Sequence, residues 1–210
     1  MRSFSITALA LLFYSGVGIC AENVDAPATA NPDLIIVRRF ATPRWIVVLD
    51  PSLGFSLDRR QPGVLRARRA ASLARATAFI LADTITEQLR DGGYDAVQLD
   101  QAGSEPGGRA LIVSGVFRRI NEGHRRHLAA KDASVEASVE IESRTHAEKP
   151  HRVMIFRLDS RQIPHESWSY REPEVNSAAR RLGVKIAHTV ADVAHRHNWP
   201  ERRPDGDRAD

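Results

Sequence analysis

The C-terminal part of the sequence carries the side chains that come nearest to a metal-binding pattern. His188, Asp192 and His195 follow one another at i, i+4 and i+7, a spacing that could place three ligands on one helix face. That face lies opposite the apolar stripe expected for the same helix, so the pattern equally describes a solvated face of mixed charge. We favour the solvated face, and we expect no metal and no other cofactor.

A dense basic cluster, His124-Arg125-Arg126-His127, follows shortly after Arg118-Arg119. Guanidinium groups in such a cluster could bind phosphate or an acidic glycan, and we retain Arg125 and Arg126 as candidate binding residues. In the alternative, which we favour, the arginines pair with acids across a hairpin and stabilise the sheet slightly. The acids available for this pairing are Glu136, Glu140 and Glu142.

Two aromatic residues, Trp168 and Tyr170, occur in a polar stretch that is expected to be a loop. An exposed aromatic ring there could stack on a sugar or on a partner protein, whereas a buried one would simply pack. We favour packing and retain Trp168 as the third candidate binding residue.

The sequence offers no recognisable catalytic motif. Ser114, in Val113-Ser114-Gly115-Val116, lacks the Gly-x-Ser-x-Gly elbow of a nucleophilic serine. Neither a phosphate-binding glycine loop nor a dinucleotide fingerprint is present, and the glycines between 103 and 108 open no helix. We therefore expect a non-enzymatic protein, with a hydrolase of unrecognised site as the less favoured alternative.

Charge and composition argue against a nucleic-acid partner. The 210 residues contain 30 Lys and Arg against 26 Asp and Glu, for a net charge of +4, and the bases are mostly arginine. Acids and bases are interspersed, and aromatic residues do not alternate with the basic clusters as they do in nucleic-acid-binding surfaces.

The first 21 residues have the pattern of a secretory signal peptide. Arg2 precedes a short apolar core, 6–17, and small residues follow it up to Ala21. Cys20 supports a second interpretation, in which the chain is lipidated at this cysteine. A flexible leader is expected over 22–33 and a disordered tail over 200–210, leaving one α/β domain over 34–199.

The stretch from Val135 to Ile141 gives the clearest structural signal. Apolar and polar residues alternate along it without a break, which is typical of a strand with one buried and one wet face. Further strands are expected at 34–37, 45–49, 94–99 and 153–158, and the run 109–123 is strand-like as well. Helices are expected at 64–91, rich in alanine and ended by Gly92-Gly93, and after Pro173.

The order of these elements is β–β–α–β–β–β–β–α. Such an order, without a repeated βαβ unit, predicts an α+β fold of two layers. We expect a mainly antiparallel sheet of about five strands, with two helices packed on one face.

The segment from Leu111 to Gly123 reads LIVSGVFRRINEG. It is followed by a basic step, the His-Arg-Arg-His cluster, and then by a Val-x-Ala-x-Val-x-Ile strand. An alanine-rich helix that ends Leu-Arg-Asp-Gly-Gly-Tyr precedes it. In these features, residues 34–160 resemble the exported bacterial domain-of-unknown-function family 4410. The resemblance implies export, often a lipid anchor, and a compact α/β domain, and it implies no known activity. Family members commonly carry a glycine-rich loop after the basic step, whereas Leu128 to Asp132 contains no glycine here.

Together these features predict a cell-envelope protein that is periplasmic or secreted, and outer-membrane-associated if it is lipid-anchored. We expect it to bind another envelope component, a protein or a glycan. A module that binds a small anion or a glycan is the alternative. The sequence indicates neither the partner nor the oligomeric state.

Overall fold

The elements of the fold follow the order that the sequence predicts. The computed structural model describes residues 32–43, 45–50, 66–100, 106–123, 133–145, 149–164, 174–196 and 199. The strands are β1 (Leu34–Arg38), β2 (Val47–Val48), β3 (Ala96–Leu99), β4 (Ala110–Asn121), β5 (Ser134–Arg144) and β6 (His151–Asp159). The helices are α2 (Arg66–Asp91) and α3 (Glu174–Arg196), with a short 3-10 turn, η1 (Ser160–Gln162), after β6.

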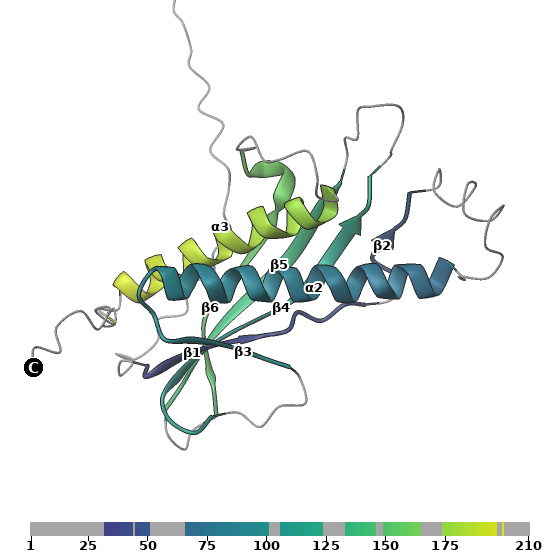
Figure 1. The fold of residues 1–210 in the computed structure, drawn as a ribbon. Coiled ribbons are helices and arrows are strands. Elements are labelled where there is room, and N and C mark those ends of the chain that lie inside the picture. The colour runs from purple at the N-terminus through teal and green to yellow at the C-terminus, as the bar shows by residue number, and fades with distance from the viewer. Residues whose placement is uncertain are drawn as a thin grey trace, which may run out of the picture.

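The strands form one mixed sheet in the order β3-β1-β4-β5-β6, and β2 pairs with the far end of β4. The pairs β4–β5 and β5–β6 are antiparallel and make up the long ladders. β1 is parallel to both β3 and β4, and β2 is parallel to β4, in shorter ladders. The α+β class with two helices over one face of the sheet is therefore confirmed (Figure 1).

The parallel half of the sheet explains why two of its strands are apolar without alternation. Ile35, Ile36 and Val37 are all buried in β1, and the neighbouring residues 110–113 of β4 are buried as well. Strands that are buried on both faces have continuous apolar sequences. A second, smaller core cluster, built on Ile36, Ala110 and Ile112, accordingly lies apart from the main one.

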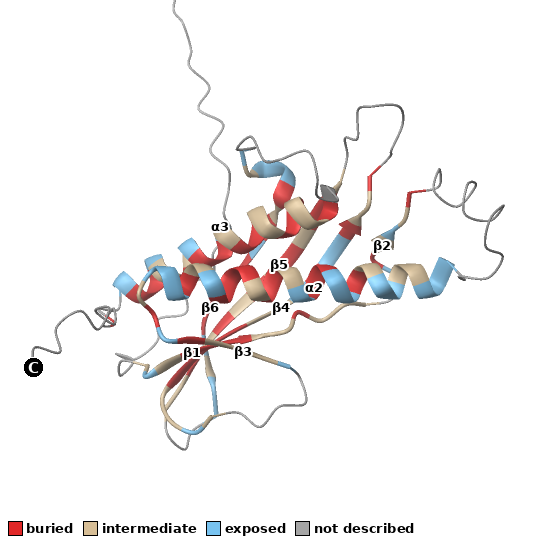
Figure 2. Cartoon of the chain, in the orientation of Figure 1, coloured by how far each residue is buried: buried red, intermediate tan, exposed pale blue. Residues whose placement is uncertain are grey.

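The two helices cover different parts of the sheet. α2 contacts β1, β2 and β3, whereas α3 contacts β5. The apolar stripe expected along α2 is buried from Ala74 onwards, but Ala67 and Ala71 are exposed. Figure 2 shows exposed and intermediate residues at this end of α2, which lies near β2, and more buried residues along the rest of the helix.

α2 and α3 also pack against each other, and they approach closely at Gly183. A Cβ atom at Gly183 would lie 2.9 Å from the Cβ of Thr84 and 3.2 Å from the carbonyl oxygen of Leu81. Glycine in a helix interior costs about 1 kcal/mol relative to alanine, so its presence in α3 needs a packing reason. The contact with Thr84 supplies it, because any larger side chain would push the helices apart.

We therefore expect Gly183→Ala to lower the free energy of unfolding by about 1–3 kcal/mol, because overpacking outweighs the gain in helix propensity. Lys185→Ala, at an exposed position two residues along the same helix, should change it by less than about 0.5 kcal/mol. Urea unfolding of the two variants measures both effects. A stabilised Gly183→Ala variant would show that the helices can separate at no cost.

Candidate functional site

The residues that the sequence singled out for binding lie outside the described part of the chain. This holds for Arg125, Arg126, Trp168 and Cys20, whose roles stay predictions. On α3, His188, Asp192 and His195 are exposed, as expected for a solvated helix face. Among the described residues, no group of three or more His, Cys, Asp or Glu side chains could hold a metal ion.

The described beginning of the basic region, Arg118-Arg119, forms a β-bulge in β4. Phe117 and Ile120 are both buried in the core although they are three residues apart, so simple alternation cannot place both on the inner face. The register with β5 shifts between Phe117 and Arg119, which brings Ile120 back to the core. Arg118 and Arg119 are consequently both exposed.

The chain along the other edge of β4 leaves the sheet at the same point. The amide of Phe117 donates to the carbonyl of Ala41 at 3.0 Å, and the amide of Ile120 donates to the carbonyl of Ile46 at 2.9 Å. Only Arg118 and Arg119 separate these two bonds on β4, whereas four residues separate Ala41 from Ile46 on the edge segment. The edge segment therefore does not follow β4 residue by residue here, and Trp45 is 85% exposed.

This exposure corrects the sequence-based prediction for residues 45–49. The apolar run WIVVL predicted a buried strand beginning at Trp45, but β2 contains only Val47 and Val48. Ile46 is buried and Val47 packs against the core, whereas Val48 is exposed. The signal that could have revealed the turn is the three-residue step between Phe117 and Ile120, which requires a bulge opposite this segment.

Glu122 joins three elements at this end of the sheet. Its Oε2 accepts a hydrogen bond from the amide of Asp50 at 2.9 Å and forms an ion pair with Arg69 of α2. Its own amide donates to the carbonyl of Val48 at 2.9 Å. The side chains of Arg69 and Glu122 are 22% and 18% exposed, so water screens the pair only in part. The first turns of α2 are thereby fixed to the carboxyl ends of β2 and β4.

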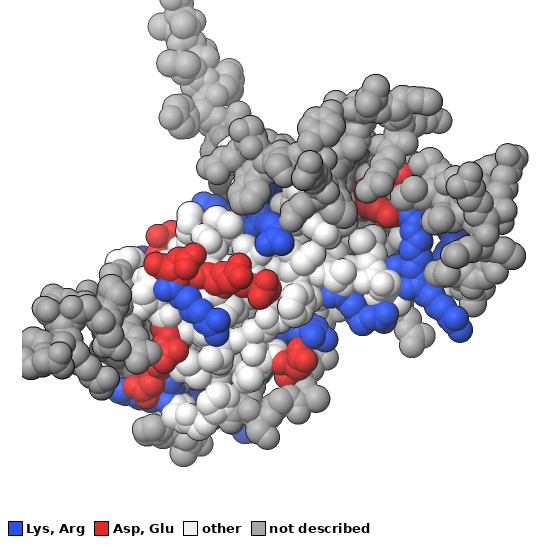
Figure 3. All heavy atoms as spheres, in the orientation of Figure 1, with Lys and Arg blue, Asp and Glu red and all other residues white. Residues whose placement is uncertain are grey.

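The N-terminal turns of α2 present arginines at the same end. Figure 3 shows Lys and Arg side chains gathered there. The first turn of α2 has no acidic residue, although the partial positive charge of a helix N-terminus favours one. Arg66, Arg68 and Arg75 of α2 and Arg118 and Arg119 of β4 are all exposed; we call these five residues the arginine surface. None of them has a hydrogen bond or ion pair with another described residue.

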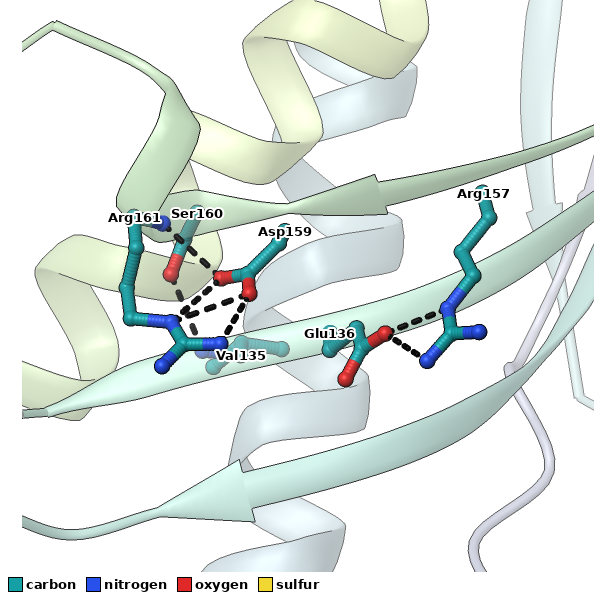
Figure 4. Close-up of polar contacts among 6 residues, drawn as sticks. All are labelled: Val135, Glu136, Arg157, Asp159, Ser160 and Arg161. Atoms are coloured by element: carbon teal, nitrogen blue, oxygen red, sulfur yellow. Dashed lines mark hydrogen bonds and ion pairs between the residues drawn. The ribbon is translucent and has the colours of Figure 1, made fainter. Parts of the chain in front are cut away.

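The acids of β5 find their partners elsewhere, on β6. Arg157 forms an ion pair with Glu136, and Arg152 forms one with Glu140 (Figure 4 shows the first). The expectation that the acids of β5 pair with the basic cluster is therefore wrong for the described arginines of β4. In the β5–β6 ladder Arg157 lies opposite Ser138 and Arg152 opposite Glu142, so each reaches the neighbouring glutamate diagonally. Arg119 lies opposite Glu136 in the β4–β5 ladder but forms no ion pair with it.

Asp159, at the end of β6, has a shifted pKa. Burial alone would raise the pKa of its carboxyl. Hydrogen bonds from the side chain and the amide of Arg161, with the charges of Arg161 and Arg119, outweigh burial and hold the pKa below its ordinary value. Figure 4 shows this contact beside the buried bond from the Val135 amide to the Ser160 hydroxyl, at 2.9 Å. The contact fixes the turn η1, whose N-cap is Asp159.

The arrangement can therefore bind anions. Three exposed arginines lie on α2 and two on the bulge of β4, and the exposed Trp45 lies on the edge segment opposite that bulge. Guanidinium groups suit carboxylate, sulfate and phosphate, which accept paired hydrogen bonds. The described helices lack the length of apolar sequence needed to cross a membrane.

Comparison with known proteins gives distant structural likenesses. No protein-family model matches this chain, and no curated protein matches it. It is similar to the PelC dodecamer from Paraburkholderia phytofirmans at 14% identity and a TM-score of 0.37, over 80% of this chain and 93% of that one. A single-substitution variant of that PelC gives 16% identity and a TM-score of 0.37, over 80% and 95% of the two chains.

A neuraminyllactose-binding hemagglutinin homolog from Helicobacter pylori is similar at 11% identity and a TM-score of 0.36, over 84% of this chain and 97% of that one. These scores are too low for the likenesses to carry an argument about function. The resemblance of residues 34–160 to family 4410 stays a prediction.

The lowered pKa of Asp159 predicts a pH-dependent contribution to stability. A carboxyl whose pKa is lowered by folding stabilises the protein above its unfolded pKa, and this stabilisation is lost as the pH falls through the folded pKa. Asp159→Asn keeps an oxygen that can cap η1 but loses the charged hydrogen bonds from Arg161, so it should lower the free energy of unfolding at pH 7 by about 1 kcal/mol. The difference from wild type should shrink below about pH 4.

Urea unfolding at pH 7 and pH 3 measures this difference. Asp192→Asn, on the exposed face of α3, serves as the control and should have little effect at either pH. An unchanged deficit for Asp159→Asn at pH 3 would contradict the assignment to this carboxylate.

The ion pair of Glu122 predicts a separate loss of stability. Glu122→Gln can still accept the bond from the Asp50 amide but loses the charge that Arg69 faces, and it should cost about 1–2 kcal/mol. Glu87→Gln, on the exposed face of α2, should cost less than about 0.5 kcal/mol. A double-mutant cycle with Arg69→Met measures the interaction energy between the two side chains. A value near zero would show that the ion pair contributes nothing to stability.

Proposed function

We propose that this protein is an exported, non-enzymatic cell-envelope protein that binds an anionic envelope component through the arginine surface. The signal-peptide pattern of residues 1–21 is the basis for export. The mature chain is periplasmic or secreted if cleavage follows Ala21, and is held at the outer membrane if Cys20 is lipidated.

The observation that carries the proposal is the difference between two groups of arginines. Arg152, Arg157 and Arg161 each face a carboxylate, in a ladder that neutralises the outer side of β5 and β6. None of the five residues of the arginine surface forms an ion pair with a described carboxylate, although the charge of Arg119 contributes to the lowered pKa of Asp159. Two of them, Arg66 and Arg68, lie in the first turn of α2, where positive charge opposes the helix dipole.

Like charges collected at one end of a protein repel one another and reduce stability. An anionic ligand would remove that repulsion and gain several charge-assisted hydrogen bonds at once. Binding would therefore be electrostatic in origin, rapid and sensitive to salt.

Charge reversal on α2 tests the proposal. Arg66→Glu together with Arg68→Glu should weaken binding of the purified protein to polyphosphate at low salt by roughly tenfold or more, because like charges now face the ligand. The same change suits the helix dipole, so the variant should fold at least as well as wild type. Fluorescence anisotropy of labelled polyphosphate measures the affinity, and thermal unfolding confirms the fold.

The matched control is Lys185→Glu together with Arg196→Glu, which reverses two exposed charges on α3 and changes the net charge equally. Its affinity for polyphosphate should stay within about twofold of wild type, apart from a small long-range effect. Equal losses in both variants would show that binding follows net charge alone and would overturn the proposed surface.

A further inference from the structure

The arginine surface includes an apolar feature that anion binding by itself does not explain. Among the described residues, the large hydrophobic side chains that are exposed are Trp45, Val48, Phe79 and Val116. Three of these four flank the bulge of β4: Val116 lies just before it, and Trp45 and Val48 lie on the edge segment opposite it. Exposed apolar groups that collect at one place mark binding surfaces.

Trp45 is held in place by the surrounding backbone. Ala41 pairs with Val116 on one side of it, and the carbonyl of Ile46 accepts a bond from Ile120 on the other. The Ile46 amide closes the intervening turn on the carbonyl of Pro43, at 3.4 Å. Because the backbone on both sides of Trp45 is hydrogen-bonded to β4, the indole is carried on the edge segment opposite Arg118 and Arg119.

The anchoring extends into the core. Phe40, the residue before Ala41, is buried over Gly115, where a Cβ atom would lie 2.5 Å from its ring. Its ring centroid is 5.7 Å from that of Phe117. The turn that carries Trp45 is therefore attached to a packed aromatic pair, and its position is set by the core.

Resting on the proposed function, we propose that the anionic component is an acidic polysaccharide and that Trp45, Arg118 and Arg119 are its specificity site. The indole offers a flat apolar face on which the C–H face of a sugar ring can stack. The guanidinium groups of Arg118 and Arg119 can each donate paired hydrogen bonds to a carboxylate of the same polymer chain. A ligand needs both rings and charges to use all three side chains.

The neighbouring strands leave a narrow strip for the ligand. Beyond Arg119, the outer face of the sheet carries Glu136, Glu140 and Asp159, each of which already pairs with an arginine of β6 or η1. The arginines without an ion pair and the exposed indole therefore lie at the β2 edge, along which a single polymer chain can run. A linear polymer that carries both rings and charges matches this strip.

A second copy of this chain fits less well. In a twofold contact the same patch lies on both sides of the interface, so Arg118 and Arg119 would face their own equivalents. Like charges placed opposite each other across an interface oppose association. The occupant is therefore expected to carry negative charge of its own.

Two polyanions separate ring stacking from charge. Trp45→Ala should weaken binding to polygalacturonate, which has sugar rings and carboxylates, by roughly tenfold, the loss typical of an aromatic anchor. Its binding to polyphosphate, which has no rings, should stay within about twofold. Trp45→Phe should retain most of the affinity for polygalacturonate, and Arg118→Gln should weaken binding to both polyanions.

Phe79→Ala is the matched control, because it removes another exposed aromatic side chain, on α2, away from the bulge. It should leave both affinities unchanged. Equal losses for both polyanions in Trp45→Ala, or no loss for either, would overturn the polysaccharide site while leaving the anionic surface in place. Failure of the wild-type protein to bind either polyanion would overturn the proposed function as well.

Vesicles containing phosphatidylglycerol test whether an anionic membrane is the ligand instead. They should not compete with polygalacturonate for the protein. If the protein bound these vesicles through Trp45 and did not bind polygalacturonate, the surface would be a membrane-binding site and the proposed polysaccharide site would be wrong.

Discussion

The structure depends on β4, which is hydrogen-bonded along both edges and supplies the core from one face. One edge carries the long antiparallel ladder with β5, and the other carries β1, the bridge at Ala41 and β2 in succession. Phe40 fixes this second edge, since its ring occupies the space that a side chain at Gly115 would fill. A larger residue at Gly115 would have to displace Phe40 or the neighbouring backbone of Ser138, and with it the segment that leads to β2.

The surface features at the end of β4 follow from this double pairing. Phe117 packs against Phe40, and Ile120 must also reach the core, so the strand takes up one extra residue between them. The edge segment keeps its hydrogen bonds on both sides of the bulge and turns outward in between. Exposure of Trp45 and of two successive arginines is thus a consequence of how the core is packed. Glu122, immediately beyond, then fixes the exposed end of α2 to the same place.

The sequence predicts the parts of this fold that repeat a simple period. Alternation from Val135 to Ile141 identifies β5 and its buried face, and the apolar stripe with Gly92-Gly93 identifies α2 and its end; Gly93 indeed has a φ of +84°. The parallel pairing of β1 could not be predicted, because a buried apolar run shows that a strand is covered and not which strands lie beside it. The exposure of Trp45 could not be predicted from residues 45–49 alone, because it depends on a bulge in another strand.

The candidate site breaks several local rules at one place, and this is the strongest reason to regard it as functional. Arginines without acids occupy the positive end of α2, two more are exposed on a bulge, and an indole is turned to solvent. The arginines in the first turn of α2 oppose the helix dipole, and an exposed indole reduces solubility. Core packing explains why positions 45, 118 and 119 are exposed but not which residue types occupy them, since a polar residue at position 45 would satisfy the turn equally well. The outer face of β5 and β6 shows that the same chain neutralises its arginines where binding is not at issue. Local violations that gather at one site, in a fold whose other elements agree with their sequence, are typical of a surface retained for a ligand.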